Sequence, residues 1–480
     1  MKEGYIPKDK RKKILFLCDD IRMTSGISTM AREIVVGTAH RYNWVNLGAA
    51  INHPDEGKRL DISQDTGRVA GIPDASVFMY PISGYGSPEM IRQLMAIEKP
   101  DAIMFFTDPR YWIWLFQIEN EIRRTVPMIY LNIWDDMPAP LYNKPYYESC
   151  DTLMAISKQT HNINKLVLGD KTKGKILKYV PHGINEKIFY PITEFMKSEN
   201  EALAKKKKQV FGDFEPEFVV FYNARNIRRK CTSDLVVAYS LFCDRIGKEK
   251  ASKCALLLHT QKQDENGTDL EAVIDLVCDP EYQKVYFSDN RVPAEEVNLL
   301  YNMSDLVALM SSNEGWGLSL TEGMMCGKMI MATVTGGMQD QMRFVDENGK
   351  WIDFDENFCS NHYGTYKEHG KWAVPLFPTN QSIVGSIPTP YILDDRASFI
   401  DASEKLEQVY NMSSEERFER GLAGREWVLS KEAMMSAKHM CDNVIDCVDE
   451  TFDKFKPRKK FELIKIEKLP KNKIVHKLVY

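Results

Sequence analysis

Short apolar runs alternate with helix-length amphipathic stretches along most of the chain. In the first 180 residues the runs are "KKILFLCDD", "PDAIMFFTD", "VPMIYLNIWDD" and "CDTLMAIS", and each ends in polar or turn-forming residues. Such runs are typical of parallel strands that are buried on both faces. The first run is followed by the turn "IRMTSGIST" and by "MAREIVVGTAHRY", which has the apolar spacing of a helix. This order predicts the opening of a doubly wound α/β domain.

The alternation is interrupted once and then resumes. The stretch "PITEFMKSENEALAKKKKQVFGDFEPE" is charged, rich in Lys and bounded by Pro, which is typical of a linker or a surface helix between domains. The runs "FVVFYNAR", "CALLLHTQ", "KVYFSD", "DLVALMSS" and "KMIMATVT" follow. The pattern therefore predicts two α/β domains in tandem, and "KEAMMSAKHMCDNVIDCVDETF" predicts one further helix.

The predicted parts have the following bounds. We expect a first domain over residues 1–192, a second over residues 193–430, a helix over residues 431–455 and a basic tail over residues 456–480. A chain of 480 residues fits two domains of roughly 200 residues each. From Asp453 to Tyr480 there are ten Lys or Arg against three Asp or Glu. This tail is either a solvated extension or the contact for an anionic partner.

Composition narrows the functional class. The net charge of −5 argues against nucleic-acid binding over the whole surface. Ten cysteines without CxxC pairs indicate buried thiols in a reducing compartment and no structural zinc. The first apolar run, residues 14–18, is too short for a signal sequence or a transmembrane segment. We therefore expect a cytoplasmic protein.

The stretch "SSNEGWGLSLTEGMMCG", Ser311 to Gly327, is the strongest candidate for a functional site. It follows an apolar strand, turns through Gly317 and enters a helix near Ser319. Ligands of open parallel sheets bind beyond the carboxyl ends of the strands, where Glu314 falls. Glycines leave backbone N–H groups accessible, and a helix N-terminus behind a glycine turn favours phosphate.

Glu322 has two interpretations. Ser319-x-x-Glu322 is a capping box, in which the glutamate reaches back to the cap residue. Alternatively, a carboxylate one turn into the helix accepts hydrogen bonds from ribose or sugar hydroxyls. With Glu314 and the glycines, the second interpretation describes a pocket for a nucleotide sugar.

Four ordered motifs carry a resemblance to a known family. Glu314 and Glu322 have the spacing of the E-x7-E motif, and "VPHGINEKIFYP", "FYNARNIRRK" and "ATVTGGMQDQM" lie in the matching order around it. Over residues 14–430 the chain resembles glycosyltransferase family 4, the retaining glycosyl transferases group 1. The resemblance implies the α/β GT-B architecture, in which two Rossmann-like domains face each other across a cleft. It also implies that the helix over residues 431–455 packs back on the first domain.

The resemblance further implies functional residues. Arg225 and Lys230 match the family's phosphate-binding pair, whereas Arg228 and Arg229 are interpreted as surface cations. Glu314 would lie nearest the transferred sugar, and Glu314, Arg225 and Lys230 are the candidate catalytic residues. The expected donor-binding residues are Gly26, Arg225, Lys230, Arg291, Glu314, Gly315, Trp316, Gly317, Leu318, Ser319 and Glu322.

Some positions depart from the family pattern. Asp135 and Asp136 stand near the place where the family often has a histidine, and with His182 they are candidate sugar or acceptor contacts. They are equally interpretable as turn, cap or structural residues. Asp353-Phe-Asp355 has the form of a metal-binding D-x-D, but such a pattern is common by chance, and we expect no metal. The segment 346–395, rich in aromatic residues, is longer than a connector and is expected to border the acceptor.

The sequence thus predicts a retaining, metal-independent hexosyltransferase that uses a nucleoside-diphosphate sugar and no cofactor. The first domain would bind most of the acceptor, which the sequence does not identify, and the second domain would bind the donor. Two alternatives remain: a sugar-nucleotide epimerase of the same architecture, and a non-catalytic sugar-nucleotide-binding protein. A nicotinamide oxidoreductase is disfavoured because "CDDIRMTSGIST" lacks G-x-G-x-x-G.

Overall fold

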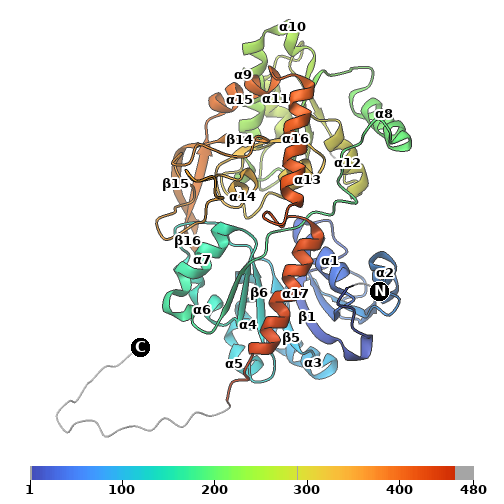
Figure 1. Ribbon diagram of the computed structural model, residues 1–480, viewed down its shortest axis with the longest axis vertical. Helices are drawn as coiled ribbons and strands as arrows, with labels where there is room; N and C mark the ends of the chain where they lie inside the picture. The colour runs from blue at the N-terminus through green and yellow to red at the C-terminus, as the bar shows by residue number, and fades with distance from the viewer. Residues whose placement is uncertain (1–2, 289, 460–480) are drawn as a thin grey trace, which may run out of the picture.

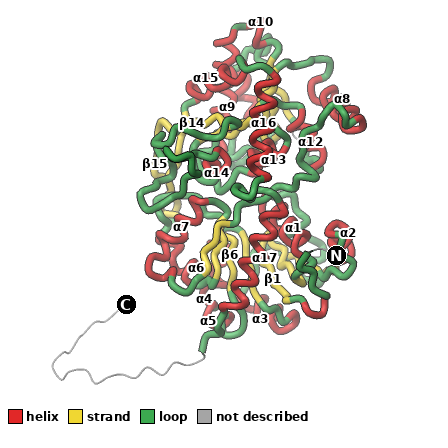
Figure 2. The backbone as a smooth tube through the Cα atoms, viewed as in Figure 1, coloured by secondary structure: helices red, strands yellow, loops and turns green. Residues whose placement is uncertain are grey.

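The computed structural model has two lobes stacked along the long axis of the molecule, each built around one β-sheet (Figures 1 and 2). It describes residues 3–288 and 290–459. The first sheet takes its strands from residues 12–179 and the second from residues 218–376. In both lobes the helices lie outside the strands (Figure 2).

The first sheet has eight strands in the order β3-β4-β2-β1-β5-β6-β7-β8. All neighbouring pairs are parallel except β3 with β4. Apolar runs form the central strands because helices cover both faces, so every residue of β5 and β6 is buried. The bounds are β1 (Lys12–Asp19), β2 (Tyr42–Ala49), β3 (Leu60–Asp61), β4 (Val77–Pro81), β5 (Ala102–Phe106), β6 (Met128–Asn132), β7 (Thr152–Ala155) and β8 (Ile176–Tyr179).

Serine caps start three of the helices of this domain soon after the strands end. The hydroxyls of Ser25, Ser87 and Ser157 each accept a hydrogen bond from a backbone N–H in the first turn, of α1, α3 and α7 respectively. Because the strands before these helices run parallel, their strand-to-helix loops lie at the same edge of the sheet. The helices are α1 (Gly26–Thr38), α2 (Ser63–Ala70), α3 (Pro88–Glu98), α4 (Ile113–Gln117), α5 (Glu119–Ile122), α6 (Lys144–Glu148) and α7 (Lys158–Leu168), with 3-10 turns η1 (Lys8–Lys10), η2 (Pro109–Trp112), η3 (Leu141–Asn143) and η4 (Gly169–Thr172).

The second sheet is fully parallel, with the order β11-β10-β9-β12-β13-β14. Its strands are β9 (Phe218–Asn223), β10 (Cys254–His259), β11 (Lys284–Phe287), β12 (Leu306–Leu309), β13 (Met329–Thr333) and β14 (Ala373–Leu376). Its helices are α8 (Lys197–Phe211), α9 (Thr232–Ile246), α10 (Lys248–Ala251), α11 (Leu270–Val277), α12 (Ala294–Asn302), α13 (Leu318–Met325), α14 (Met338–Met342), α15 (Phe399–Tyr410) and α16 (Ser414–Leu429), with the 3-10 turn η5 (Arg228–Lys230).

The segment after β13 bridges the two domains. It ends in the antiparallel hairpin β15 (Pro378–Ser386) and β16 (Thr389–Ala397). Backbone groups of this segment bond to the first domain: Leu393 N donates to Met137 O at 2.7 Å, and Tyr391 O accepts from the Tyr142 hydroxyl at 2.9 Å. The hairpin therefore lies beside the first domain as well as the second (Figure 1).

Within the described residues the chain crosses between the lobes twice, and the two crossings are paired. Ile184, on the outward crossing, donates to Met435 O at 3.0 Å and accepts from Ala437 N at 2.9 Å on the return. Gly183 fits because its Cα faces the returning backbone: a Cβ there would lie 2.2 Å from Ser436 O.

The last helix, α17 (Ala437–Lys454), packs on the first domain (Figure 1). Asp449 accepts hydrogen bonds from Tyr42 and Arg41 at 2.7 and 2.5 Å. The helix predicted over 431–455 begins later, at Ala437, because the Ser436 hydroxyl accepts from His439 N and caps it. Of the basic tail predicted over 456–480, residues 460–480 lie outside the described residues. No helix in the described part of the chain combines the length and apolarity needed to cross a bilayer.

We predict that Gly183→Ala lowers the stability of the protein. The added methyl group would overlap the backbone of Ser436, which has no rotamer to change, so the two crossings must separate. Overpacking of this kind costs typically about 1–3 kcal/mol. The measurement is the urea midpoint, compared with Gly84→Ala, where a Cβ meets nothing within 4 Å. Equal midpoints for the two variants would contradict the prediction.

Candidate active site between the domains

Glu314 lies just beyond the carboxyl end of β12 and is held by two cations. It is 8% exposed. Its Oε2 accepts hydrogen bonds from Lys230 Nζ and from Arg229 Nη1, the latter at 3.0 Å. Arg229 also donates to Asn313 O at 2.9 Å. Burial alone would raise the pKa of Glu314, but Lys230 and Arg229 outweigh it and lower that pKa to about 2.

A second glycine loop fixes the backbone around Glu314. A Cβ on Gly336 would lie 2.1 Å from Glu314 O, and one on Gly337 would lie 2.1 Å from Gly315 O. Gly337 N donates to Glu314 O at 3.0 Å. The predicted loop "ATVTGGMQDQM" is therefore a support that only glycines allow, because any side chain would push the glutamate loop away.

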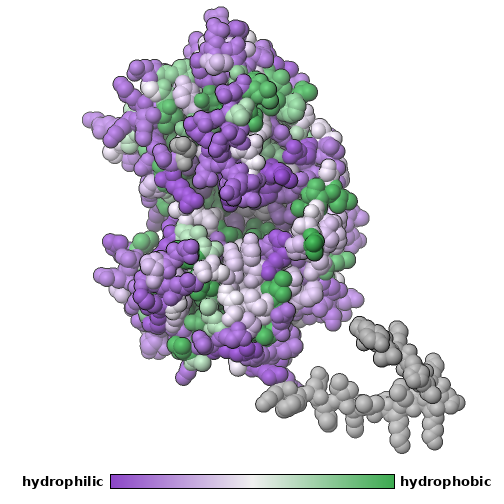
Figure 3. All heavy atoms as spheres, turned by 180° about the vertical axis from the view of Figure 1, so that it is seen from behind, coloured by the Kyte–Doolittle hydropathy of each residue, from purple (hydrophilic) through white to green (hydrophobic). Residues whose placement is uncertain are grey.

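The helix α13 begins where the sequence predicts. Gly317 has φ +83° and precedes Leu318, the first helical residue. Ser319 is buried in the first turn. Across the gap between domains, a Cβ on Gly26 at the start of α1 would lie 3.1 Å from Leu318 Cδ1. The N-termini of α1 and α13 thus approach each other where the lobes meet, and a recess separates the lobes in Figure 3.

Glu322 does not form the capping box. Its Oε2 accepts from the Tyr301 hydroxyl at 2.6 Å and from Asn223 Nδ2 at 3.3 Å, and Gly317 is the cap residue of α13 with no side-chain hydrogen bond. Burial raises the pKa of Glu322 from 4.5 to about 7, and the Tyr301 hydrogen bond only partly opposes this. Its carboxyl group is therefore held by neutral partners, which favours a role as a hydrogen-bonding group for a neutral hydroxyl.

Backbone and ring contacts join the glutamate loop to the first domain. A Cβ on Gly315 would lie 2.9 Å from Ile133 O. Trp316 is 2% exposed, and the His182 ring packs edge to face against Trp316 and Phe106, with ring centroids 6.3 and 5.7 Å away. Burial lowers the pKa of His182 to about 3. Both Trp316 and His182 thus pack in the interface, and His182 is neutral there.

Asp135 and Asp136 place carboxyl groups of the first domain near Arg229 and Glu314. They follow β6, and the charges of Arg229 and Glu314 both act on Asp135. Burial raises the pKa of Asp135 to about 6, Arg229 lowers it and Glu314 raises it. Burial and the neighbouring Asp135 raise the pKa of Asp136 well above its usual range. We call Asp135, Asp136, Arg229, Lys230 and Glu314 the interdomain site.

The structure does not bring Arg225 into the interdomain site. Its side chain is 61% exposed and pairs with Asp264, with Nε to Oδ2 at 2.6 Å. Arg229, interpreted from the sequence as a surface cation, contacts Glu314 beside Lys230 instead. The turn η5 causes this change, because it folds Arg229 and Lys230 back toward β12 while Arg225 stays in the loop after β9. Arg291 lies exposed in the loop after β11.

Sequence reasoning missed a second support for the glutamate loop. On β16, Asp394 Oδ1 accepts from Ser312 Oγ at 3.1 Å and from Asn313 Nδ2 at 2.9 Å. Asp395 is fully buried, accepts from Thr335 Oγ1 at 2.7 Å and donates its N–H to Ser312 O at 2.9 Å. The segment predicted only to border the acceptor therefore also ties the two loops around Glu314 together. In a chain with 27% charged residues, two adjacent aspartates do not indicate that they contact the loops around Glu314.

The D-x-D pattern is used for other contacts. Asp353 accepts from Lys158 Nζ at 2.9 Å, and Asp355 accepts from Asn357 N at 2.8 Å. Among the described residues no group of three His, Cys, Asp or Glu side chains could hold a metal ion.

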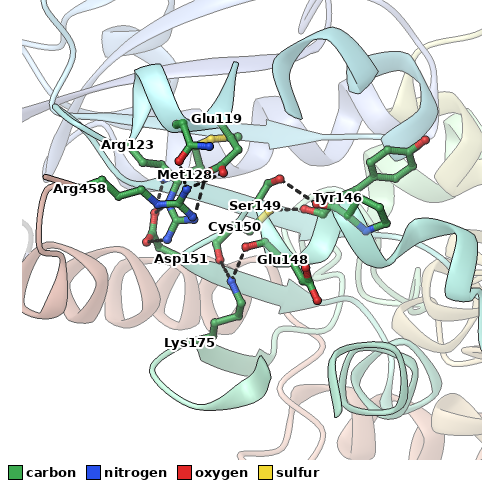
Figure 4. Close-up of polar contacts among 12 residues, drawn as sticks. Glu119, Arg123, Met128, Tyr146, Glu148, Ser149, Cys150, Asp151, Lys175 and Arg458 are labelled. Atoms are coloured by element: carbon green, nitrogen blue, oxygen red, sulfur yellow. Dashed lines mark hydrogen bonds and ion pairs between the residues drawn. The ribbon is translucent and has the colours of Figure 1, made fainter. Parts of the chain in front are cut away.

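Two cavities, of ≈ 760 and ≈ 1020 Å³, lie on the first domain near the amino ends of its strands, away from the interdomain site. The polar groups beside the smaller one satisfy each other (Figure 4). Arg123 pairs with Asp151 at 2.5 Å, Arg458 pairs with Glu119 at 2.6 Å, and Lys175 donates to the Glu148 and Cys150 carbonyls. This network anchors the chain after α17. We therefore identify the candidate site by the chemistry of the interdomain site and not by cavity size.

We predict that Glu322→Gln changes the pH dependence of stability. The folded protein holds the Glu322 proton up to about pH 7, whereas the unfolded chain releases it near 4.5. Wild-type stability is therefore lost as pH rises between these values, by at most about 3 kcal/mol, and the glutamine variant avoids this loss. The stability of the variant relative to wild type should rise from pH 4.5 to 7 and then level off in urea unfolding.

The control for this prediction is Glu295→Gln, at an exposed position on α12, the helix that carries Tyr301. A difference between Glu322→Gln and wild type that does not change with pH would contradict the assignment of this titration to Glu322.

Comparisons with known proteins agree with this geometry. Residues 204–357 match the family model "Glycosyl transferases group 1". This region contains the loop after β9, the glutamate loop and the glycine loop, and so most of the interdomain site. Comparison with curated protein sequences finds no match.

Solved structures match nearly the whole chain. HepE of Anabaena, in complex with UDP and glucose, has a TM-score of 0.61 and 13% identity, with 92% of this chain and 100% of that chain covered. Sucrose-phosphate synthase of Thermosynechococcus elongatus has a TM-score of 0.63 and 15% identity, with the same coverage. Trehalose 6-phosphate synthase of Burkholderia multivorans has a TM-score of 0.59 and 10% identity, with 92% and 98% covered. The chain thus has the GT-B fold, and its second domain carries the match to glycosyl transferases group 1.

Proposed function

We propose that this protein is a glycosyltransferase that moves a sugar from a nucleoside-diphosphate sugar to an acceptor. The observation that carries the proposal is the pair Arg229 and Lys230, which converge on Glu314 at the meeting of two α/β domains. The family match of residues 204–357 and the GT-B fold support the same conclusion. The diphosphate, the ribose and the transferred sugar of a nucleotide sugar then each have a chemically suitable group in or beside the interdomain site.

Arg229 and Lys230 would bind the donor diphosphate. In the structure both cations donate hydrogen bonds to the carboxylate of Glu314. A diphosphate carries more negative charge than that carboxylate, so the diphosphate would compete with Glu314 for the two cations. The N-terminus of α13, behind Gly317, offers backbone N–H groups to the same anion. When the bond to the sugar breaks, the charge on the leaving phosphate increases, and these fixed donors then stabilise it most.

The two glutamates would hold the hydroxyls of the donor. Glu314, released in part from its cations, would accept from the transferred sugar and stabilise positive charge developing at its anomeric carbon. Glu322, oriented by Tyr301 and Asn223, would bind the ribose. Gly26 and Gly315 would let the two domains approach closely around the donor, because a side chain at either position would meet Leu318 or Ile133 of the other domain.

We propose transfer with retention and without a resident metal. The sugar–phosphate C–O bond breaks while a new C–O bond forms on the same face, and the acceptor proton passes to an oxygen of the leaving phosphate. Arg229 and Lys230 supply the positive charge that a metal would supply. Asp135 and Asp136, across from Arg229, would contact the sugar or the acceptor, which the first domain would hold.

The donor we propose is a UDP-hexose, since HepE binds UDP, glucose and UDP-glucose. The ten cysteines are thiols, which supports work in the reducing cytoplasm. The test is a thermal-shift series with UDP, GDP, ADP and their common sugar conjugates, because a ligand of the folded state raises the apparent melting temperature. Stabilisation by UDP and its sugar conjugates supports the proposal, and stabilisation by the GDP or ADP family instead would overturn the choice of donor. Stabilisation by none of them, or formation of an epimeric donor sugar without an acceptor, would overturn the proposal.

We predict that Arg229→Ala and Lys230→Ala each weaken UDP binding about 10- to 100-fold. Each variant removes a charge-assisted hydrogen bond to phosphate, worth roughly 1.5–3 kcal/mol. The matched control is Arg225→Ala, which removes an equal charge from the exposed pair with Asp264 and should change the Kd less than about threefold. Isothermal titration calorimetry of UDP measures all three. A large loss in Arg225→Ala with none in Arg229→Ala would favour the pairing expected from the sequence.

A further inference from the structure

A stacked pair of tyrosines lies at the carboxyl edge of the first sheet. The rings of Tyr85 and Tyr111 are parallel within 3°, with centroids 4.1 Å apart, and Tyr111 is 48% exposed. The Tyr85 hydroxyl donates to Asp19 Oδ1 at 3.2 Å, and Ser25 Oγ donates to Asp19 Oδ2 at 3.0 Å. Gly86, with φ +88°, lets the loop that carries Tyr85 pack against Trp114. An exposed aromatic face thus stands beside a buried carboxylate whose geometry is fixed.

This tyrosine pair lies on the side of the first domain that faces the second. Asp19 ends β1, Tyr85 follows β4 and Tyr111 follows β5, so all three lie at the carboxyl ends of strands. At the same edge Gly26 approaches Leu318 of the second domain. The pair therefore lies on the face where the proposed function puts the acceptor.

The charges of this face are mostly negative. The ends of β1, β2, β4, β5 and β6 and the loops after them, all described by the structure, carry Asp19, Asp20, Asp55, Glu56, Asp108, Asp135 and Asp136 against Arg22, Lys58, Arg59 and Arg110. Each of these cations is paired with a carboxylate of the first domain: Lys58 pairs with Asp55 at 2.7 Å, and Arg59 pairs with Glu98 at 2.6 Å. Arg22 pairs with Asp20 at 2.6 Å, and Arg110 pairs with Asp108. Among the ion pairs of the described residues, neither Asp19 nor Asp135 is paired with a cation from these loops.

We propose that the acceptor is an uncharged carbohydrate, whose C–H face packs on Tyr111 and whose hydroxyls donate to Asp19 and Asp135. This proposal rests on the proposed function and names its acceptor class. An apolar ring face beside acceptor-only carboxylates matches a sugar, which has an apolar face rimmed with hydroxyl donors. A phosphorylated or acidic acceptor would meet Asp19 and Asp135 with every cation of these loops already paired, and this repulsion disfavours it.

The reaction that follows is balanced. One acceptor hydroxyl oxygen forms the bond to the anomeric carbon of the donor sugar, the bond from that carbon to the phosphate oxygen breaks, and the hydroxyl proton goes to the leaving phosphate. No oxidant, reductant or further reactant is needed.

The test uses the full chain with UDP-glucose, GDP-mannose and ADP-glucose as donors, each offered matched acceptors. The pairs are glucose with glucose 6-phosphate, and methyl glucoside with glucuronic acid, extended by neutral di- and trisaccharides. Product formation is followed by mass spectrometry and nucleotide release by a coupled assay. We expect at least tenfold faster transfer to the best neutral acceptor than to either acidic sugar. Faster transfer to an acidic sugar would overturn the proposal, and so would nucleotide release with no transfer to any neutral sugar.

Tyr111→Ala supplies the second readout. It should raise the KM for the neutral acceptor about tenfold while leaving the KM for the donor unchanged, because it removes apolar area from the acceptor alone. The matched control is Phe418→Ala, on α16, where the side chain is also 48% exposed. Equal acceptor KM values for the two variants would overturn the role of Tyr111. Failure of the proposed function would appear differently, as no nucleotide binding and no nucleotide release with any donor.

Discussion

The structure depends on keeping one buried carboxylate, Glu314, charged. A carboxylate in this position would be protonated unless positive charge lay within hydrogen-bond distance, and Lys230 and Arg229 supply it. Those cations come from the turn after β9, so the loops after two neighbouring strands must converge to within 3.0 Å. That convergence requires a backbone that tolerates no side chain at Gly336 or Gly337. The order β9-β12-β13 therefore brings the cations, the glutamate and the glycine support together in one place.

The same constraint couples the domains. Asp135 experiences the charges of both Arg229 and Glu314, so its carboxyl group responds to residues of the other domain. Gly315 lies against Ile133 O, and the hairpin β15–β16 bonds to Met137 on one side and to Ser312 on the other. The site is thus complete only when both domains are in place. The paired crossings near Ile184 and the packing of α17 on the first domain hold them together.

Much of the fold could be predicted because it depends on local patterns. The buried runs that became β1, β5, β6 and β7, and the turn into α13 at Gly317, follow from apolar periodicity and from glycine. Strands such as β2, "YNWVNLGA", escaped prediction because polar Asn residues interrupt the run, although Asn46 is fully buried and bonds to Phe16 O. The hairpin β15–β16 and the roles of Asp394 and Asp395 were also missed, because their partners lie about 60 to 80 residues away in the chain. The spacing of residues along the sequence does not predict contacts between residues so far apart.

The contrast between Arg225 and Arg229 shows how the path of the chain decides which side chains of a motif lie together. An interpretation of the spacing from Arg225 to Lys230 assumes that the chain between them has the family's usual path. Here that chain holds a 3-10 turn, η5, which ends at Cys231 in a left-handed conformation, φ +50°. Such a turn redirects successive side chains, and Arg225 finds Asp264 on the adjacent loop after β10. A buried charged carboxylate needs positive charge within hydrogen-bond distance, and the turn determines which neighbouring cations supply it; here they are Arg229 and Lys230.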